Sequence, residues 1–181
     1  DLYIVSGGNE FEPNTPILKD RLYINNGKGS FNYNNSSLPD NFSSGMRVSS
    51  ADFDKDGDID LFVGGRVVPG SYPLPAESFL LENISDANGI KFKNTDESIF
   101  SFKEIGLVTS SVWTDYNNDG WEDLVVVGEW TPIKFYKNME GKFSEDTSLI
   151  DIDSTRGWWY DVISEDFDND GDMDLVIGNL G

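Results

Sequence analysis

The chain has 181 residues and is 38% hydrophobic, which is enough apolar material for a folded domain with a real core. Its 33 acidic residues outnumber its 13 basic ones, and the resulting net charge of -20 would repel nucleic-acid phosphates and anionic membrane surfaces. The sequence has no cysteine and no histidine, which excludes disulfides, thiolate chemistry and histidine-assisted catalysis. No apolar run approaches the roughly 18 residues that cross a bilayer, so we expect no membrane insertion.

The sequence pattern of residues 1–35 predicts three strands. The chain opens with the apolar segment DLYIV and a glycine soon after it. The phrase DRLYINNGKGSF, from Asp20 to Phe31, then places an apolar strand before an Asn/Gly turn and a second strand. This pattern is typical of a β-hairpin.

A nine-residue phrase of the form D-x-[DN]-x-D-G-x-x-D then occurs three times. The copies are DFDKDGDID from Asp52 to Asp60, DYNNDGWED from Asp115 to Asp123 and DFDNDGDMD from Asp166 to Asp174. They begin 63 and then 51 residues apart, a period typical of propeller blades and other repeat arrays. Each copy runs into a short apolar segment that ends in glycine, as the opening DLYIVSG does.

The strands around each phrase predict one repeating unit. A short strand precedes the phrase, another follows it, and a hairpin with an Asn/Gly turn completes four antiparallel strands, the content of a propeller blade. We therefore predict an all-β chain, with a part-blade at 1–35, blades at 46–94 and 109–145, and a part-blade at 158–181. A closed ring needs at least about four blades, so we expect further blades or self-association to cover the open edges. Asp1 would then be the last position of a fourth phrase.

The phrase has the residues that a calcium loop needs. In the first copy, Asp52, Asp54 and Asp56 direct side-chain oxygens from positions 1, 3 and 5 of a tight loop toward one point. Gly57 allows the sharp turn because it lacks a Cβ. Position 7 would contribute its carbonyl, which leaves its side chain free to vary, and Asp60 would close the site.

The phrase has two alternative interpretations. An EF-hand requires glutamate at position 12 between helices, but the chain has Val63, Val126 or Ile177 there, inside predicted strands. A plain solvated Asp/Gly turn would gain nothing from four carboxylates that repel one another. Three copies at matching strand positions favour a metal loop over a simple turn.

These segments resemble the FG-GAP/VCBS repeats of integrin-α-type β-propellers. The segments SGGNEF, DRLYINNGKGSF, LFVGGRVVPGSYPLP, VVVGEWTPI and DLVIGNLG look like the propeller of ASPIC/UnbV proteins of Bacteroidetes. The resemblance implies a ring of about seven blades that is secreted, periplasmic or exposed on the cell surface. The C-terminal ASPIC/UnbV segment is not found in this sequence, and the family brings no established reaction.

The resemblance also implies about three structural Ca²⁺ sites. Their ligands by position are Asp52, Asp54, Asp56, Asp58 by its carbonyl, and Asp60; Asp115, Asn117, Asp119, Trp121 by its carbonyl, and Asp123; and Asp166, Asp168, Asp170, Asp172 by its carbonyl, and Asp174. The middle loop has Asn117 where the others have aspartate. It carries one formal charge less, so we expect it to bind Ca²⁺ more weakly.

The loops at the other ends of the strands form a second candidate surface. In a blade, the phrases share one face, so the connections at 7–20, 65–78 and 146–158 lie on the opposite face. Its notable residues are Arg66, Tyr72, Trp130, Arg156, Trp158 and Trp159. Two readings stay open, because large aromatic side chains also pack between blades, whereas aromatics beside arginines suit a glycan.

The predicted function is a calcium-binding propeller module with an extracellular binding or scaffolding role and an unknown protein or glycan partner. The alternative is a carbohydrate-active protein, either a polysaccharide binder or a lyase, that uses the face opposite the phrases. The dense carboxylate clusters are all accounted for by the phrases, and no separate acid/base pair has a recognisable spacing. We therefore assign no catalytic residue. The first residues lack the basic start of a signal peptide, so any targeting segment is expected to have been removed.

Overall fold

A computed structural model describes residues 1–149 and 152–180. Residues 150 and 151, within the predicted connection 146–158, and Gly181, the end of the predicted last part-blade, lie outside the described residues. The described residues form antiparallel strands and two short 3-10 helices, η1 (Pro16–Leu18) and η2 (Ile152–Thr155). Among these residues, no helix is long and apolar enough to cross a membrane.

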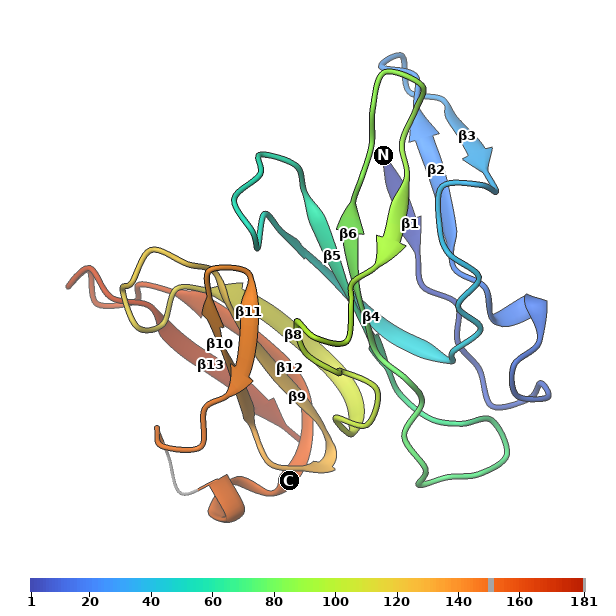
Figure 1. Cartoon of the computed structure of the whole chain (residues 1–181). Coiled ribbons are helices and arrows are strands. Elements are labelled where there is room, and N and C mark those ends of the chain that lie inside the picture. The colour runs from blue at the N-terminus through green and yellow to red at the C-terminus, as the bar shows by residue number, and fades with distance from the viewer. Residues whose placement is uncertain (150–151, 181) are drawn as a thin grey trace.

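The first two sheets follow the chain in simple up-and-down order (Figure 1). One sheet has three strands in the order β1 (Leu2–Ile4), β2 (Arg21–Asn25) and β3 (Phe31–Asn34). The next has four strands, β4 (Gly45–Ala51), β5 (Asp60–Gly65), β6 (Phe79–Asn83) and β7 (Phe92–Asn94). The four strands of this second sheet form a complete antiparallel meander, which is the content of one blade.

The last two strand groups are joined into one sheet of six strands. The third meander comprises β8 (Leu107–Thr114), β9 (Asp123–Thr131), β10 (Lys134–Met139) and β11 (Lys142–Glu145). It is followed by the pair β12 (Gly157–Glu165) and β13 (Asp174–Asn179). The strand β12 pairs with the end of β9 at Gly157 and Trp158, opposite Thr131 and Glu129. This link between neighbouring blades was not predicted, because it depends on how two repeats meet in space.

The strands that precede the three phrases lie beside one another. Small hydroxyl side chains connect them: Ser49 on β4 lies 2.8 Å from Ser111 on β8 (Oγ to Oγ), and Thr109 on β8 donates to the backbone carbonyl of Trp159 on β12 at 2.7 Å. Between β8 and β12, Thr114 Oγ1 also lies 2.9 Å from Ser164 Oγ. Serine and threonine are compact enough to let these strands approach, as the innermost strands of a propeller must.

The hydrophobic core lies between successive sheets. One cluster joins Phe53 of the β4–β5 loop and Phe62 of β5 to Leu124, Val126 and Tyr136 of the third sheet, and these side chains are buried. A second cluster joins the first sheet to the second, and a third joins β9 and β10 to Val162 on β12. Each blade is thus stabilised mainly by its neighbours, as expected for a repeat array.

The all-β prediction of antiparallel four-stranded units is confirmed, and the arrangement is propeller-like. The sheets do not close into a ring within the described residues, and β12–β13 leaves an apolar face open. Val176 on β13 is 51% exposed, whereas Val125 and Phe62, at the same place in the preceding repeats, are 0% exposed. The number of blades in a closed ring remains a prediction.

Asp20, just before β2, gives the fold a predicted pH dependence. Its carboxylate accepts hydrogen bonds from the Tyr3 hydroxyl and the Ser6 backbone N–H, both at 2.7 Å, and burial raises its pKa to about 6. The folded state therefore favours protonated Asp20, which increases the free energy of unfolding. This stabilisation is complete below about pH 4 and is lost as the pH rises through 6. We expect the free energy of unfolding of wild type, measured by urea unfolding in chelator, to fall between pH 4 and 7. The fall should exceed that of Asp20→Asn by on the order of 1 kcal/mol. A constant difference would contradict this assignment.

Candidate metal centres

The three phrases form loops with the same backbone conformation. Position 4 has a positive φ in each, at 61° for Lys55, 56° for Asn118 and 62° for Asn169. The glycine at position 6 has φ values of 96°, 89° and 98° at Gly57, Gly120 and Gly171. Glycine adopts such angles without strain, so the predicted need for a glycine there is explained by the observed turn.

The aspartate at position 1 organises each loop from within. Its carboxylate accepts the backbone N–H of the position 6 glycine, at 3.1 Å for Asp52, 2.7 Å for Asp115 and 3.1 Å for Asp166. These contacts fold the loop back on its first residue. The polar side chains of positions 1, 3 and 5 are thereby brought to one side.

The aspartate at position 9 ties the loop to the next hairpin. Asp60 and Asp123 are fully buried, and each accepts the backbone N–H of an asparagine, Asn83 or Asn138, at 2.7 Å. Burial raises the pKa of Asp60 to about 7 and that of Asp123 to about 6. Asp1 likewise accepts the backbone N–H of an asparagine, Asn25, at 2.9 Å.

The carboxylates gather most closely in the first and third loops. One oxygen from each of Asp52, Asp54 and Asp56 lies within 4.8 Å of the others, as do oxygens of Asp166, Asp168 and Asp174. The Asp52 Oδ1 atom is buried and has no hydrogen-bond partner within the described residues. A buried carboxylate oxygen without a donor is costly, and a bound cation would satisfy it. The donor set therefore fits a hard divalent metal.

The middle loop differs in its side-chain pairing. The Asn117 amide donates to Asp123 Oδ2 at 2.7 Å, and the Lys137 ammonium lies 3.3 Å from Asp119 Oδ2. Two of the prospective ligand residues are thus engaged with protein donors. Within the described part of the chain, the aspartates of this loop do not form as close a group as those of the other two.

Contacts also connect the first loop to the second. Asn138, which is fully buried at the end of β10, donates its side-chain amide to the carbonyls of Phe53 at 2.7 Å and Glu122 at 3.0 Å. The Lys55 ammonium lies 4.1 Å from the centroid of the Trp121 ring, a cation–π contact. These contacts therefore connect neighbouring phrases. The sequence did not reveal that Asn138 takes part in them.

A family profile for the FG-GAP-like repeat matches residues 1–63 and 115–177. These two segments cover more than half of the chain and include all three loops. The chain belongs to the FG-GAP-like repeat family. A comparison with curated proteins gave no match.

In this FG-GAP chain the loops opposite the phrases bring several predicted residues together. In Figure 1 the β4–β5, β8–β9 and β12–β13 loops extend to the upper left, while the β5–β6 loop and η2 lie at the other end of the sheets. Trp130 Nε1 donates to the Tyr72 hydroxyl, and the Trp130 and Trp158 ring centroids are 5.1 Å apart. Arg66 forms an ion pair with Glu129, which is 1% exposed and which no sequence motif had identified.

Trp159 and Arg156 are the two remaining candidates of this face. Trp159 packs on the core of β9, β10 and β12, and its Nε1 donates to the Thr155 carbonyl at 2.9 Å, so the packing interpretation describes it well. Arg156 is exposed beside η2. The structure therefore brings Tyr72, Trp130 and Trp158 together and places Trp159 against the core.

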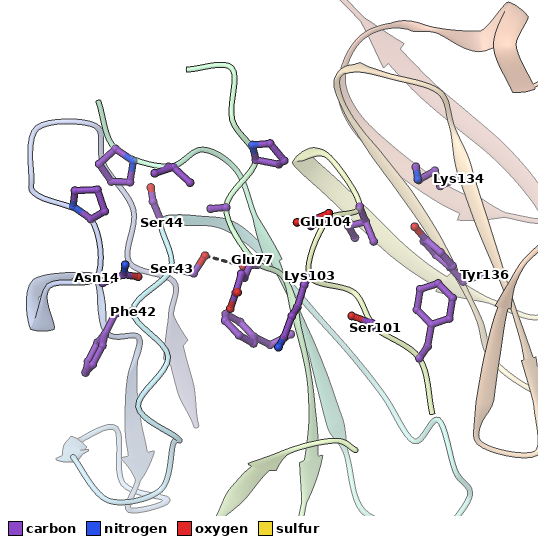
Figure 2. A pocket seen from close by; sticks show the side chains of 18 of the residues that line it. Asn14, Phe42, Ser43, Ser44, Glu77, Ser101, Lys103, Glu104, Lys134 and Tyr136 are labelled. Atoms are coloured by element: carbon purple, nitrogen blue, oxygen red, sulfur yellow. Dashed lines mark hydrogen bonds between the residues drawn. The ribbon is translucent and has the colours of Figure 1, made fainter. Parts of the chain in front are cut away.

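A groove of about 620 Å³ runs beside the β5–β6 loop, between the sheets (Figure 2). Its lining includes Ser44 at one end and Lys134, Glu104 and Tyr136 at the other. The Tyr136 side chain is fully buried, and within the described residues its hydroxyl has no hydrogen-bond partner. Sequence reasoning missed this groove because its lining comes from segments far apart in the chain.

Proposed function

We propose that this FG-GAP chain is a calcium-binding propeller module in which Ca²⁺ fixes the loops between the first two strands of each blade. The observation that carries the proposal is the pair of close carboxylate groups, Asp52/Asp54/Asp56 and Asp166/Asp168/Asp174, each with oxygens within 4.8 Å. Backbone N–H groups hold the position 1 aspartates in place without any metal. The ion would add the charge that lets these carboxylates remain close together.

Calcium suits these loops better than magnesium. Ca²⁺ accepts six to eight oxygens in flexible geometry, and the proposed set combines side chains at positions 1, 3, 5 and 9 with the carbonyl of position 7. Mg²⁺ requires near-ideal octahedral geometry and retains several waters, so a loop that surrounds the ion with protein oxygens disfavours it.

We place the module outside the cytosol, secreted, periplasmic or on the cell surface. Extracellular calcium modules commonly bind with Kd values of about 10⁻⁴ to 10⁻³ M, so their sites fill at extracellular but not cytosolic calcium concentrations. Its role there is binding or scaffolding. The open apolar face at Val176 fits a further blade, in the same chain or a second copy, because the equivalent residues of the preceding repeats are covered by the next blade.

The proposal predicts that the middle loop binds Ca²⁺ most weakly. Asn117 lacks the charge of Asp54 and Asp168, and its amide already contacts Asp123. Isothermal titration with Ca²⁺ should resolve a weak site that Asn117→Asp strengthens by about tenfold, on the order of 1.4 kcal/mol. The reverse change, Asp54→Asn, should weaken the first site. If the titration gives no heat of Ca²⁺ binding, the proposed function is wrong. If the middle loop binds Ca²⁺ most tightly, the predicted order of affinities is wrong.

A further inference from the structure

Three aromatic side chains form a strip on the face opposite the metal loops. The strip consists of Tyr72 from the β5–β6 loop, Trp130 at the end of β9 and Trp158 at the start of β12. Tyr72 is 52% exposed and Trp130 is 55% exposed. Residues so large and amphipathic are normally much more buried, so this exposure needs an explanation.

The strip is held in place by ordered backbone. Trp130 has a positive φ of 58°, an unusual conformation for a bulky residue that turns the chain at the end of a buried strand segment. The loop that carries Tyr72 is closed by the hydrogen bond from the Val68 N–H to the Leu74 carbonyl at 2.9 Å, and its Gly70 N–H donates to Asn9 Oδ1 at 2.8 Å. The rings are therefore presented by a fixed scaffold.

We propose that this strip binds a neutral polysaccharide by stacking of sugar rings on Tyr72 and Trp130. A pyranose ring has a face of C–H groups and an edge of hydroxyls, which matches an aromatic face next to polar groups. The Tyr72 hydroxyl accepts the Trp130 N–H and still has its own proton to donate. Trp158 Nε1 is buried and has no partner within the described residues.

The ion pair of Arg66 and the net charge of the chain favour a neutral sugar over an acidic one. Arg66 is the cation nearest in sequence to Tyr72, and its guanidinium is paired with the buried carboxylate of Glu129. A uronate or sulfate would have to compete with that ion pair. The chain also carries a net charge of -20, which repels polyanions at a distance.

The groove supports the same ligand chemistry. It is lined by Val68, Pro69 and Pro75 of the loop that also carries Tyr72, so strip and groove share one loop. Figure 2 shows the Tyr136 hydroxyl at the end of the groove near Lys134 and Glu104. The partnerless Tyr136 hydroxyl and the Lys134 ammonium, which lies 3.5 Å from Glu145 Oε1, are polar groups that suit the hydroxyls of a sugar chain that continues past the strip.

Affinity gel electrophoresis of the calcium-loaded chain tests the proposal. The neutral probes are mixed-linkage β-glucan, xylan and galactomannan, and the acidic probes are alginate and polygalacturonate. We expect retardation by at least one neutral polysaccharide and none by the acidic ones. Trp130→Ala and Tyr72→Ala should each weaken that binding at least tenfold.

Tyr33→Ala is the matched control, because Tyr33 on β3 is equally exposed, at 54%, and lies outside the strip. It should bind as wild type does, and Tyr72→Phe, which keeps the ring, should bind better than Tyr72→Ala. If Trp130→Ala fails to fold, the exposed Tyr72 variants carry the test. No retardation by any neutral probe, retardation only by acidic ones, or variants that bind like wild type would each overturn the proposal. Calcium titration of the same samples tests the metal loops separately.

Discussion

Adding about 10 mM calcium to the chelator-treated chain is expected to raise the midpoint of thermal unfolding by roughly 10 to 20 °C. A ligand at 100 times its Kd stabilises the folded state by about 2.7 kcal/mol per site, and a 1 kcal/mol change shifts the midpoint of a domain of this size by about 2 to 4 °C. The first and third loops, whose carboxylates are closest together, should supply most of the effect. Circular dichroism melting in calcium, in magnesium and in chelator measures it.

Two variants separate metal ligation from simple relief of charge repulsion. Asp52→Asn removes a position 1 carboxylate and should abolish the part of the calcium response that comes from the first loop. Asp58→Asn removes the same charge from position 7, where only the backbone carbonyl is a proposed ligand, and should leave most of the response. Equal responses in the two variants would mean that calcium merely screens the acidic surface. An unchanged midpoint in wild type would remove the calcium proposal.

Replacing Asn138 by alanine is expected to destabilise the chain by about 3 kcal/mol. The asparagine is fully buried, its amide donates to the carbonyls of Phe53 and Glu122, and its oxygen accepts the Gly141 N–H at 2.8 Å. Alanine would leave these buried backbone groups unpaired, and each unsatisfied group costs about 1 to 3 kcal/mol. Urea unfolding in calcium measures the loss.

Asn83→Ala is the matched control for Asn138→Ala. Asn83 occupies the equivalent place in the preceding repeat, but within the described residues its amide donates only to the Ile59 carbonyl of its own repeat, at 3.1 Å, and it is less buried. It should cost about 1 kcal/mol. Equal losses for the two variants would contradict the idea that Asn138 stabilises the contact between blades.

Much of the fold and of the metal loops could be predicted because both depend on short stretches of sequence. The strands before and after each phrase lie within a few residues of the predicted segments, although β8 extends to Leu107 and β12 begins at Gly157. A hairpin or a nine-residue loop closes on itself, so its turn residues and its alternating pattern are visible locally. The close carboxylates of Asp52, Asp54 and Asp56 follow from such local geometry.

The relations between repeats could not be read in this way. Glu129 lies in an apolar run, and nothing in its neighbourhood identifies Arg66, 63 residues away, as its partner. The same holds for the Tyr136 hydroxyl: whether it has a hydrogen-bond partner depends on which side chains the fold places around it, and in the part of the chain that the structure describes it has none. Predicting such contacts requires the relative placement of two sheets, which depends on the packing of many side chains at once.

The sequence by itself therefore determined the unit of this FG-GAP chain: four antiparallel strands, with an aspartate loop between the first two, repeated along the chain. Only the tertiary structure decided how the units meet, through the Asn138 contacts, the β9–β12 link and the strip of Tyr72, Trp130 and Trp158. The physical reason is the range of the interactions. Turn geometry and alternation act between residues that are close in sequence, whereas core packing and buried polar contacts join residues that only the folded chain brings together.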